Sequence, residues 1–89
     1  MIRERVTIIN KLGLHARASA KLNTLAQQFE SRIVVEKDGQ QADAKSIMSL
    51  MMLAASKGTD IQLEVDGSDE AKAFAAIKAL IDDYFEEGE

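Results

Sequence analysis

The residues best suited to chemistry lie between Asn10 and Ala20, a segment that contains the only histidine of the chain, His15. Asn10 and Gly13 predict a turn before His15, and an alanine-rich helical pattern begins directly after it. A helix N-terminus presents unpaired backbone N–H groups and the positive end of the helix dipole, which together favour a bound anion, phosphate above all. Arg17 adds a planar cation for phosphate oxygens. The segment therefore predicts that His15 is a phosphoryl acceptor.

These local features leave an alternative open, because a lone histidine at a helix start is more often only a tolerated polar residue. The chain has no cysteine, which excludes disulfides and thiolate metal sites. A metal site would need His15 and carboxylates alone, so we expect neither a metal nor a cofactor. The sequence shows no apolar run of membrane-spanning length and no signal peptide. We therefore expect a cytoplasmic protein without membrane insertion.

The charges are unevenly distributed along the chain. Residues 1–45 carry eight Lys and Arg against five Asp and Glu, whereas residues 46–89 carry three against ten. No acid lies between Arg5 and Gln28. We therefore expect a basic surface around His15, which would favour anionic ligands or acidic partner faces but not nucleic acid.

Alternating apolar and polar residues predict four strands, at residues 2–9, 31–36, 40–43 and 60–65. The first places Val6 and Ile8 on one face, and the fourth alternates most clearly. Asp38-Gly39 between the second and third strands predicts a tight hairpin turn, because both residues readily adopt positive φ.

Apolar spacings of three and four predict three helices. The first runs from Ala16 to about Gln28. Ser46 is the expected N-cap of the second, which runs from Ile47 to about Ser56 and is apolar on more than one side, so it should expose part of that surface. Ser68 is the expected N-cap of the third, whose predicted buried stripe is Phe74, Ile77, Leu80, Ile81 and Tyr84. Residues 86–89 are expected to be frayed and solvated.

The predicted order is strand, helix, strand, strand, helix, strand, helix. Two layers satisfy this order: one antiparallel sheet with the helices on a single face. The sequence therefore predicts one domain, residues 1–89, of the α+β class with an open-faced sandwich architecture.

The segment Gly13-Leu14-His15-Ala16-Arg17 resembles the active-site motif of HPr, the phosphocarrier protein of the bacterial phosphoenolpyruvate-dependent phosphotransferase system. The resemblance extends through Ala44-Lys45-Ser46-Ile47-Met48 and Lys57-Gly58-Thr59 and covers nearly the whole chain. It implies a four-stranded sheet in the order 1-4-2-3 with three helices on one face. It also implies a monomeric carrier rather than a stand-alone enzyme.

The resemblance further implies a role for each matching residue. Phosphorylated enzyme I would transfer its phosphoryl group to Nδ1 of His15, and the carrier would pass it to a IIA-type domain, in sugar uptake or in a regulatory phosphorelay. Arg17 and the backbone N–H groups of Ala16, Arg17 and Ala18 would hold the phosphoryl oxygens. HPr kinase/phosphorylase would modify Ser46, and partners would dock on Ile47, Met48 and Met51.

One position departs from the resemblance, because Ala18 stands where HPr proteins commonly have proline. Alanine restores a backbone donor and forms helices well, so we expect the helix and the chemistry to survive. The departure makes the chain more similar to HPr-type proteins of regulatory phosphorelays.

The alternative function is a small regulatory binding module without phosphoryl transfer. RNA binding is disfavoured, because no aromatic residue falls on a predicted strand. A hydrolase using His15 as its base would lack a nucleophile with a nearby orienting carboxylate. A ligand-sensing domain stays open, and acid-labile phosphorylation of His15 would distinguish it from a carrier.

Overall fold

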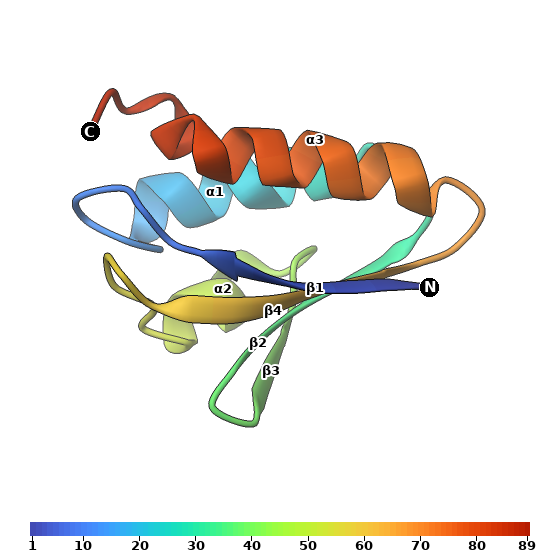
Figure 1. Cartoon of the computed structure of the whole chain (residues 1–89), viewed down its shortest axis with the longest axis horizontal. Helices are drawn as coiled ribbons and strands as arrows, with labels where there is room; N and C mark the ends of the chain where they lie inside the picture. The colour runs from blue at the N-terminus through green and yellow to red at the C-terminus, as the bar shows by residue number, and fades with distance from the viewer.

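The computed structural model describes residues 1–89 and follows the predicted order of elements. These are β1 (Ile2–Thr7), α1 (Ala16–Ala26), β2 (Arg32–Lys37), β3 (Gln40–Asp43), α2 (Ile47–Met52), β4 (Asp60–Asp66), α3 (Glu70–Asp82) and a short 3₁₀ turn, η1 (Tyr84–Glu86). All strand pairs are antiparallel and the sheet order is β1-β4-β2-β3, which confirms the predicted open-faced α+β architecture. Figure 1 shows α1 and α3 running alongside each other over the sheet. None of the helices has the length and apolar character needed to cross a bilayer.

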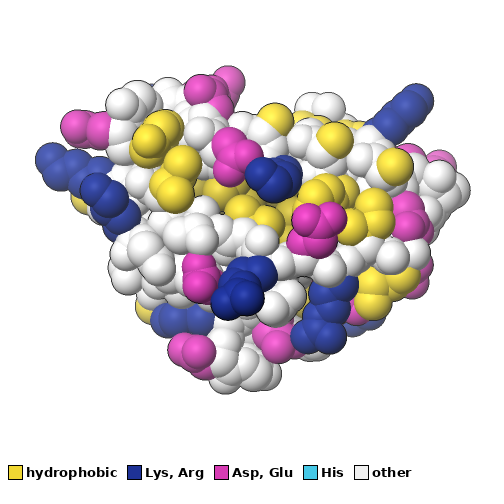
Figure 2. Space-filling model, in the orientation of Figure 1, with side chains coloured by type: hydrophobic (Ala, Val, Ile, Leu, Met, Phe, Trp, Pro, Cys, Tyr) yellow, Lys and Arg dark blue, Asp and Glu magenta, His cyan; other side chains and the backbone are white.

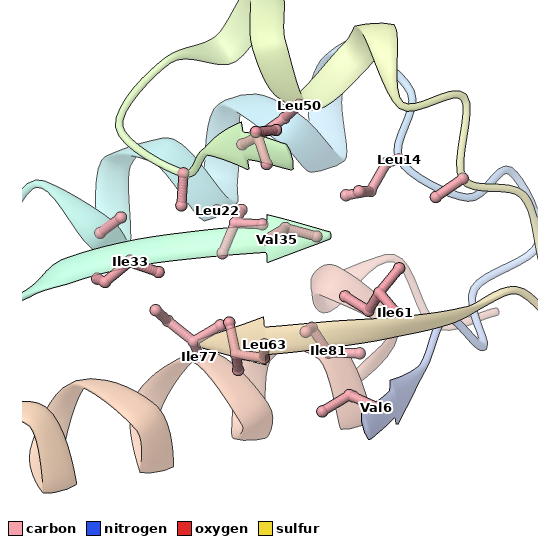
Figure 3. Close-up of a cluster of buried hydrophobic side chains, with 14 of the residues drawn as sticks. Val6, Leu14, Leu22, Ile33, Val35, Leu50, Ile61, Leu63, Ile77 and Ile81 are labelled. Carbon is pink, nitrogen blue, oxygen red and sulfur yellow. The ribbon is translucent and has the colours of Figure 1, made fainter. Parts of the chain in front are cut away.

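The core lies between the sheet and the helices, and its side chains converge from every layer (Figure 3). The alternation predicted for the strands places one face of each strand in this core, and the fully buried members include Ile33, Val35, Ile61, Leu63 and Val65. The helices contribute Leu22, Leu50, Ile77 and Ile81. The core is mainly aliphatic, as the low aromatic content requires.

Figure 2 shows hydrophobic side chains between α3 and the β1 edge of the sheet, with acidic and basic side chains dispersed over the rest of that face. The histidine is not visible there, so this view lies away from His15.

Helix α2 is shorter than predicted, since it ends at Met52 rather than near Ser56. Ala54 has a φ of 52°, in the left-handed region, so the helix cannot continue through it. Lys37 Nζ donates to the carbonyl oxygens of Leu53 and Ala54, at 3.0 and 3.4 Å, and so provides a hydrogen-bond donor for carbonyl groups at the helix end. A long-range contact therefore fixes a helix end that the sequence pattern placed too late.

Helix α3 begins one residue later than predicted, because Asp69 and not Ser68 is its N-cap residue. The Asp69 carboxylate does not cap its own helix but accepts hydrogen bonds from the backbone N–H groups of Glu30 and Ser31, at 2.9 and 3.0 Å. Gly67 N donates to Glu70 Oε1, 3.2 Å away, in the first turn. Asp69 therefore ties the start of α3 to the chain before β2.

The C-terminal end of α3 also differs from the prediction. Tyr84 is 39% exposed, whereas the next residue, Phe85, is fully buried. Tyr84, Phe85 and Glu86 have φ values of 56°, 53° and 64°, so the chain leaves the right-handed helix after Asp82. This change of hand breaks the helical spacing and turns Phe85, in place of Tyr84, into the core.

Candidate functional site

His15 lies directly before α1, as predicted, and is its N-cap residue, with extended backbone angles of φ −78° and ψ −179°. Its carbonyl oxygen accepts from Ser19 N, 2.9 Å away, whereas the backbone N–H groups of Ala16, Arg17 and Ala18 have no backbone acceptor. Ala16 and Arg17 are exposed and Ala18 is buried. The structure therefore brings together the histidine, the arginine and the unpaired N–H groups on which the prediction depended.

The loop before His15 is held by close backbone packing. Gly13 has a φ of 67°, and a Cβ atom there would lie 2.3 Å from the carbonyl oxygen of Ala55. The adjacent Leu14 N donates to that same oxygen at 2.8 Å, and the Leu14 side chain is buried. Only glycine fits this conformation and this close approach. The contact fixes His15 relative to the chain that follows α2.

The residues after α3 are not frayed, contrary to the prediction. They return to the loop before α1, and Figure 1 shows the C-terminal end of the chain near that loop. Glu87 Oε2 lies 2.6 Å from His15 Nε2, and Lys11 N donates to the carbonyl oxygen of Glu89 at 3.0 Å. Lys21 Nζ donates to the carbonyl oxygen of Phe85 at 2.9 Å. The buried Phe85 anchors this segment in the core.

Asn10 connects Glu87 to the histidine loop. This side chain is fully buried, and its Nδ2 donates to Gly13 O at 2.8 Å and to Glu87 Oε1 at 3.0 Å. Its Oδ1 is buried without a partner. Burial raises the pKa of Glu87. Hydrogen bonds from Asn10 and His15, and the charges of His15 and Lys21, lower that pKa by more than burial raises it, so the pKa lies below the usual glutamate value. Glu87 is therefore a carboxylate at neutral pH.

A hollow of about 330 Å³ opens beside the histidine, and it is lined by Lys11, Leu12, His15, Arg17, Glu86, Glu87 and Glu89. The expectation of a basic surface around His15 is therefore wrong. The acidic tail, remote in sequence, places three carboxylates beside the cations of the first helix and its loop. Two of these cations form ion pairs with the tail, Lys11 with Glu89 at 4.0 Å and Lys21 with Glu86 at 3.6 Å.

The second predicted cluster lies on α2. Ser46 is the N-cap residue, as predicted, and its Oγ accepts from Ser49 N at 3.3 Å. Leu50 is the only buried residue of the helix, which confirms that α2 exposes apolar surface. This exposed apolar patch consists of Ile47, Met48, Met51 and Met52.

Three residues of this site carry no clear signal in the sequence: Asn10 as a side-chain contact, Glu87 and Phe85. In the sequence Asn10 indicates only a turn, and Glu87 lies 72 residues from His15 in a tail of ordinary acidic composition. Phe85, next to the predicted stripe, was the one available signal, since an apolar side chain of that size at the end of a helix is often anchored.

Comparison with known proteins gives a consistent result. Residues 2–83 match the family model described as the PTS HPr component phosphorylation site. The chain is 56% identical to phosphocarrier protein HPr of Neisseria meningitidis over 89 residues, which is 100% of both chains. It resembles the crystal structure of HPr-C-His from Thermoanaerobacter tengcongensis with a TM-score of 0.94 and 42% identity, over 98% of each chain. An HPr dimer from the same organism gives a TM-score of 0.77 at 42% identity, over 96% of this chain and 98% of that one.

A family match over most of the chain and a relative at this identity, aligned from end to end, are sufficient to assign the family. The chain belongs to the HPr family, the carrier proteins that receive a phosphoryl group from enzyme I and pass it to IIA-type domains of the bacterial phosphotransferase system.

Proposed function

We propose that His15 carries the phosphoryl group, on its Nδ1 atom. The observation that supports this best is the division of roles between the two ring nitrogens. Nε2 is held by Glu87 at 2.6 Å, whereas Nδ1 makes no hydrogen bond within the protein. The ring lies at the start of α1, where phosphate oxygens would meet unpaired N–H groups and the positive end of the helix dipole. Nδ1 is thus the ring nitrogen left for the phosphoryl group.

Arg17 and the backbone N–H groups of Ala16, Arg17 and Ala18 would stabilise the phosphoryl oxygens. The guanidinium lines the same hollow as His15. Donors placed before the reaction stabilise the charge that the phosphoryl group carries in the transition state without having to reorganise. Their stabilisation of the phosphorylated state must stay moderate, because a carrier has to release the group again.

The test is enzyme I-dependent labelling from phosphoenolpyruvate. The wild-type chain should gain one acid-labile phosphoryl group, detected as a mass increase that is lost at low pH, and should transfer it to a IIA-type domain. His15→Ala should keep its circular dichroism spectrum and gain no label. If His15→Ala is labelled as efficiently as the wild type, another residue is the acceptor. A folded wild-type chain that takes up no label would favour the regulatory binding module instead.

The exposed apolar patch is the surface we propose for docking of enzyme I and IIA-type domains, through Ile47, Met48 and Met51. It adjoins the histidine loop, because Leu14 N bonds to Ala55 O just beyond α2. Methionine side chains adapt to differently shaped partners, which suits a carrier with one donor and several acceptors. The carrier would act as a monomer in the cytoplasm.

Ser46 is the residue we propose for regulatory phosphorylation by an HPr kinase/phosphorylase. The resemblance of residues 44–48 to the segment that this enzyme modifies supports the proposal. Ser46 also lies directly before Ile47 and Met48, at the rim of the exposed apolar patch. A phosphate there would add roughly two negative charges to a docking surface. The helix N-terminus would tolerate it, so docking and not folding should change.

A further inference from the structure

The short contact between His15 and Glu87 determines which tautomer the histidine adopts. Glu87 Oε2 lies 2.6 Å from His15 Nε2, and the side chain of His15 is 28% exposed and that of Glu87 11% exposed. An ionised carboxylate can only accept hydrogen bonds. In a neutral imidazole facing this carboxylate, the proton must therefore be on Nε2, and Nδ1 keeps its lone pair.

The position of Glu87 is fixed from several sides. Asn10 Nδ2 donates to Glu87 Oε1 at 3.0 Å and to Gly13 O at 2.8 Å. Both partners are acceptors, so only the orientation with Nδ2 toward them forms hydrogen bonds. Phe85 lies fully buried two residues before Glu87. The three successive left-handed residues before Glu87 cost about 1–2 kcal/mol each, so this turn persists only because such contacts hold it.

We propose that Glu87 is a positioning residue for phosphoryl transfer. It holds His15 in the Nε2–H tautomer, which leaves Nδ1 as the nucleophile, and it compensates the positive charge that the ring acquires on phosphorylation. Asn10 positions Glu87 in turn. The proposal rests on the proposed role of His15 as the phosphoryl acceptor.

The transfer step balances without loss of a proton from the ring. The Nδ1 lone pair forms the new N–P bond, while the bond between phosphorus and the donor group of enzyme I breaks and leaves its electron pair on the donor. The proton stays on Nε2, so the phosphorylated ring carries a positive charge beside the Glu87 carboxylate. Transfer to a IIA-type domain reverses these changes at His15. Because Lys11 and Lys21 pair with Glu89 and Glu86, Glu87 remains directed at His15 and Asn10.

The decisive variant is Glu87→Gln, which keeps the size of the side chain. Asn10 Nδ2 is held by Gly13 O and still presents a donor, so the glutamine carbonyl should take the place of Oε1. The glutamine NH₂ group then faces Nε2 and donates to it, which moves the ring proton to Nδ1. An Asp→Asn change beside a catalytic histidine is known to leave the wrong tautomer in this manner.

We expect ¹⁵N NMR of the imidazole, recorded at a pH where the ring is neutral, to show protonated Nε2 in the wild type and protonated Nδ1 in Glu87→Gln. Phosphoryl uptake from enzyme I should fall at least about tenfold in Glu87→Gln. Phosphoryl uptake should fall less in Glu87→Ala, because this change removes the preference for one tautomer without imposing the other. The matched control is Asp83→Asn, which removes one charge near the same tail at an exposed residue that makes no side-chain contact with His15.

Protonated Nδ1 in the wild type, or wild-type uptake by folded Glu87→Gln, would overturn the proposal. The wild-type spectrum needs no variant, so the test stands even if Glu87→Gln unfolds. An equal loss of uptake in Asp83→Asn would assign the effect to net charge and also overturn the proposal. If the wild type itself takes up no label on His15, the proposed function fails, and the NMR result shows separately whether Glu87 sets the tautomer.

Discussion

Arg17 differs from the other two cations near His15 because it forms no ion pair. Lys11 and Lys21 are paired with Glu89 and Glu86, whereas the exposed Arg17 guanidinium faces the hollow without a salt bridge. An unpaired guanidinium can follow the phosphoryl group without first breaking a contact.

Replacing Arg17 should therefore affect transfer and not folding. Arg17→Ala should slow phosphoryl uptake by about 100-fold, the usual effect of removing one preorganised donor. The uptake rate of Arg17→Lys should lie between those of the wild type and Arg17→Ala, because the lysine ammonium group keeps the positive charge without the planar geometry of the guanidinium. Stopped-flow or quench-flow labelling gives the rates, and thermal unfolding should give similar melting temperatures. Unchanged uptake in Arg17→Ala would remove this residue from the phosphoryl site.

Glu87 should also give stability a specific pH dependence. Its pKa is below the usual value in the folded chain, where Asn10 and His15 donate to it against the effect of burial, so the unfolded chain binds the proton more tightly. Its contribution to stability is therefore complete above the unfolded pKa, and it is lost as the pH falls through the folded pKa. The difference in melting temperature between wild type and Glu87→Gln should shrink as the pH falls below about 4.5. A difference independent of pH down to pH 3 would contradict this assignment.

At the scale of elements, α2 has two functions that mutations can separate. Its N-cap stabilises the helix, and its exposed apolar residues form the proposed docking surface. The helix has only six residues, so its single cap matters more than it would in a long helix.

Three substitutions at Ser46 distinguish the cap from the regulatory switch. Ser46→Ala should lower the free energy of unfolding by about 1 kcal/mol, because the acceptor for Ser49 N is lost. Ser46→Asp and Ser46→Asn both keep a good cap, so their stability should stay near that of the wild type. Only Ser46→Asp should slow phosphoryl uptake, because it alone adds charge beside the docking surface. Equal uptake by the Asp and Asn variants would leave Ser46 as a cap alone.

The docking role of α2 is tested by Met48, which is 68% exposed. Met48→Glu should weaken binding to enzyme I, measured by isothermal titration calorimetry, with little change in melting temperature. Leu50→Ala on the buried side should instead cost about 2–5 kcal/mol of stability. Gln40→Glu adds the same charge at the exposed start of β3 and serves as the control. Binding weakened equally by Gln40→Glu would show that charge, and not the apolar patch, is responsible.

At the scale of the whole molecule, the last residues connect the core to the histidine. Phe85→Ala should cost about 3–5 kcal/mol, because a fully buried aromatic side chain is lost. It should also release Glu87 and with it the preference of His15 for the Nε2–H tautomer. Tyr84→Ala, at the exposed neighbour, should do neither. Chemical denaturation measures the loss of stability, and the imidazole ¹⁵N spectrum reports the tautomer. An unchanged stability in Phe85→Ala would instead support the frayed tail that the sequence predicts.

The sequence by itself determined the elements and the place of the proposed phosphoryl acceptor. Strand alternation and helical spacing are local, so they gave the order of elements and most of the buried side chains, including Val35, Leu63 and Ile77. The position of His15 before a helix start was equally local, because the turn at Gly13 and the alanine-rich pattern lie beside it in the chain.

Tertiary structure alone decided the features that join distant residues. Helix α2 stops early where Ala54 is left-handed and where Lys37, 17 residues away, bonds to its carbonyl oxygen. Phe85 replaces Tyr84 in the core because the chain reverses its hand after α3, which no periodicity indicates. That reversal brings Glu87 to within 2.6 Å of His15 across 72 residues. Periodicity indicates which face of an element is buried. The partner of a polar side chain depends instead on where the fold of the whole chain places the two residues.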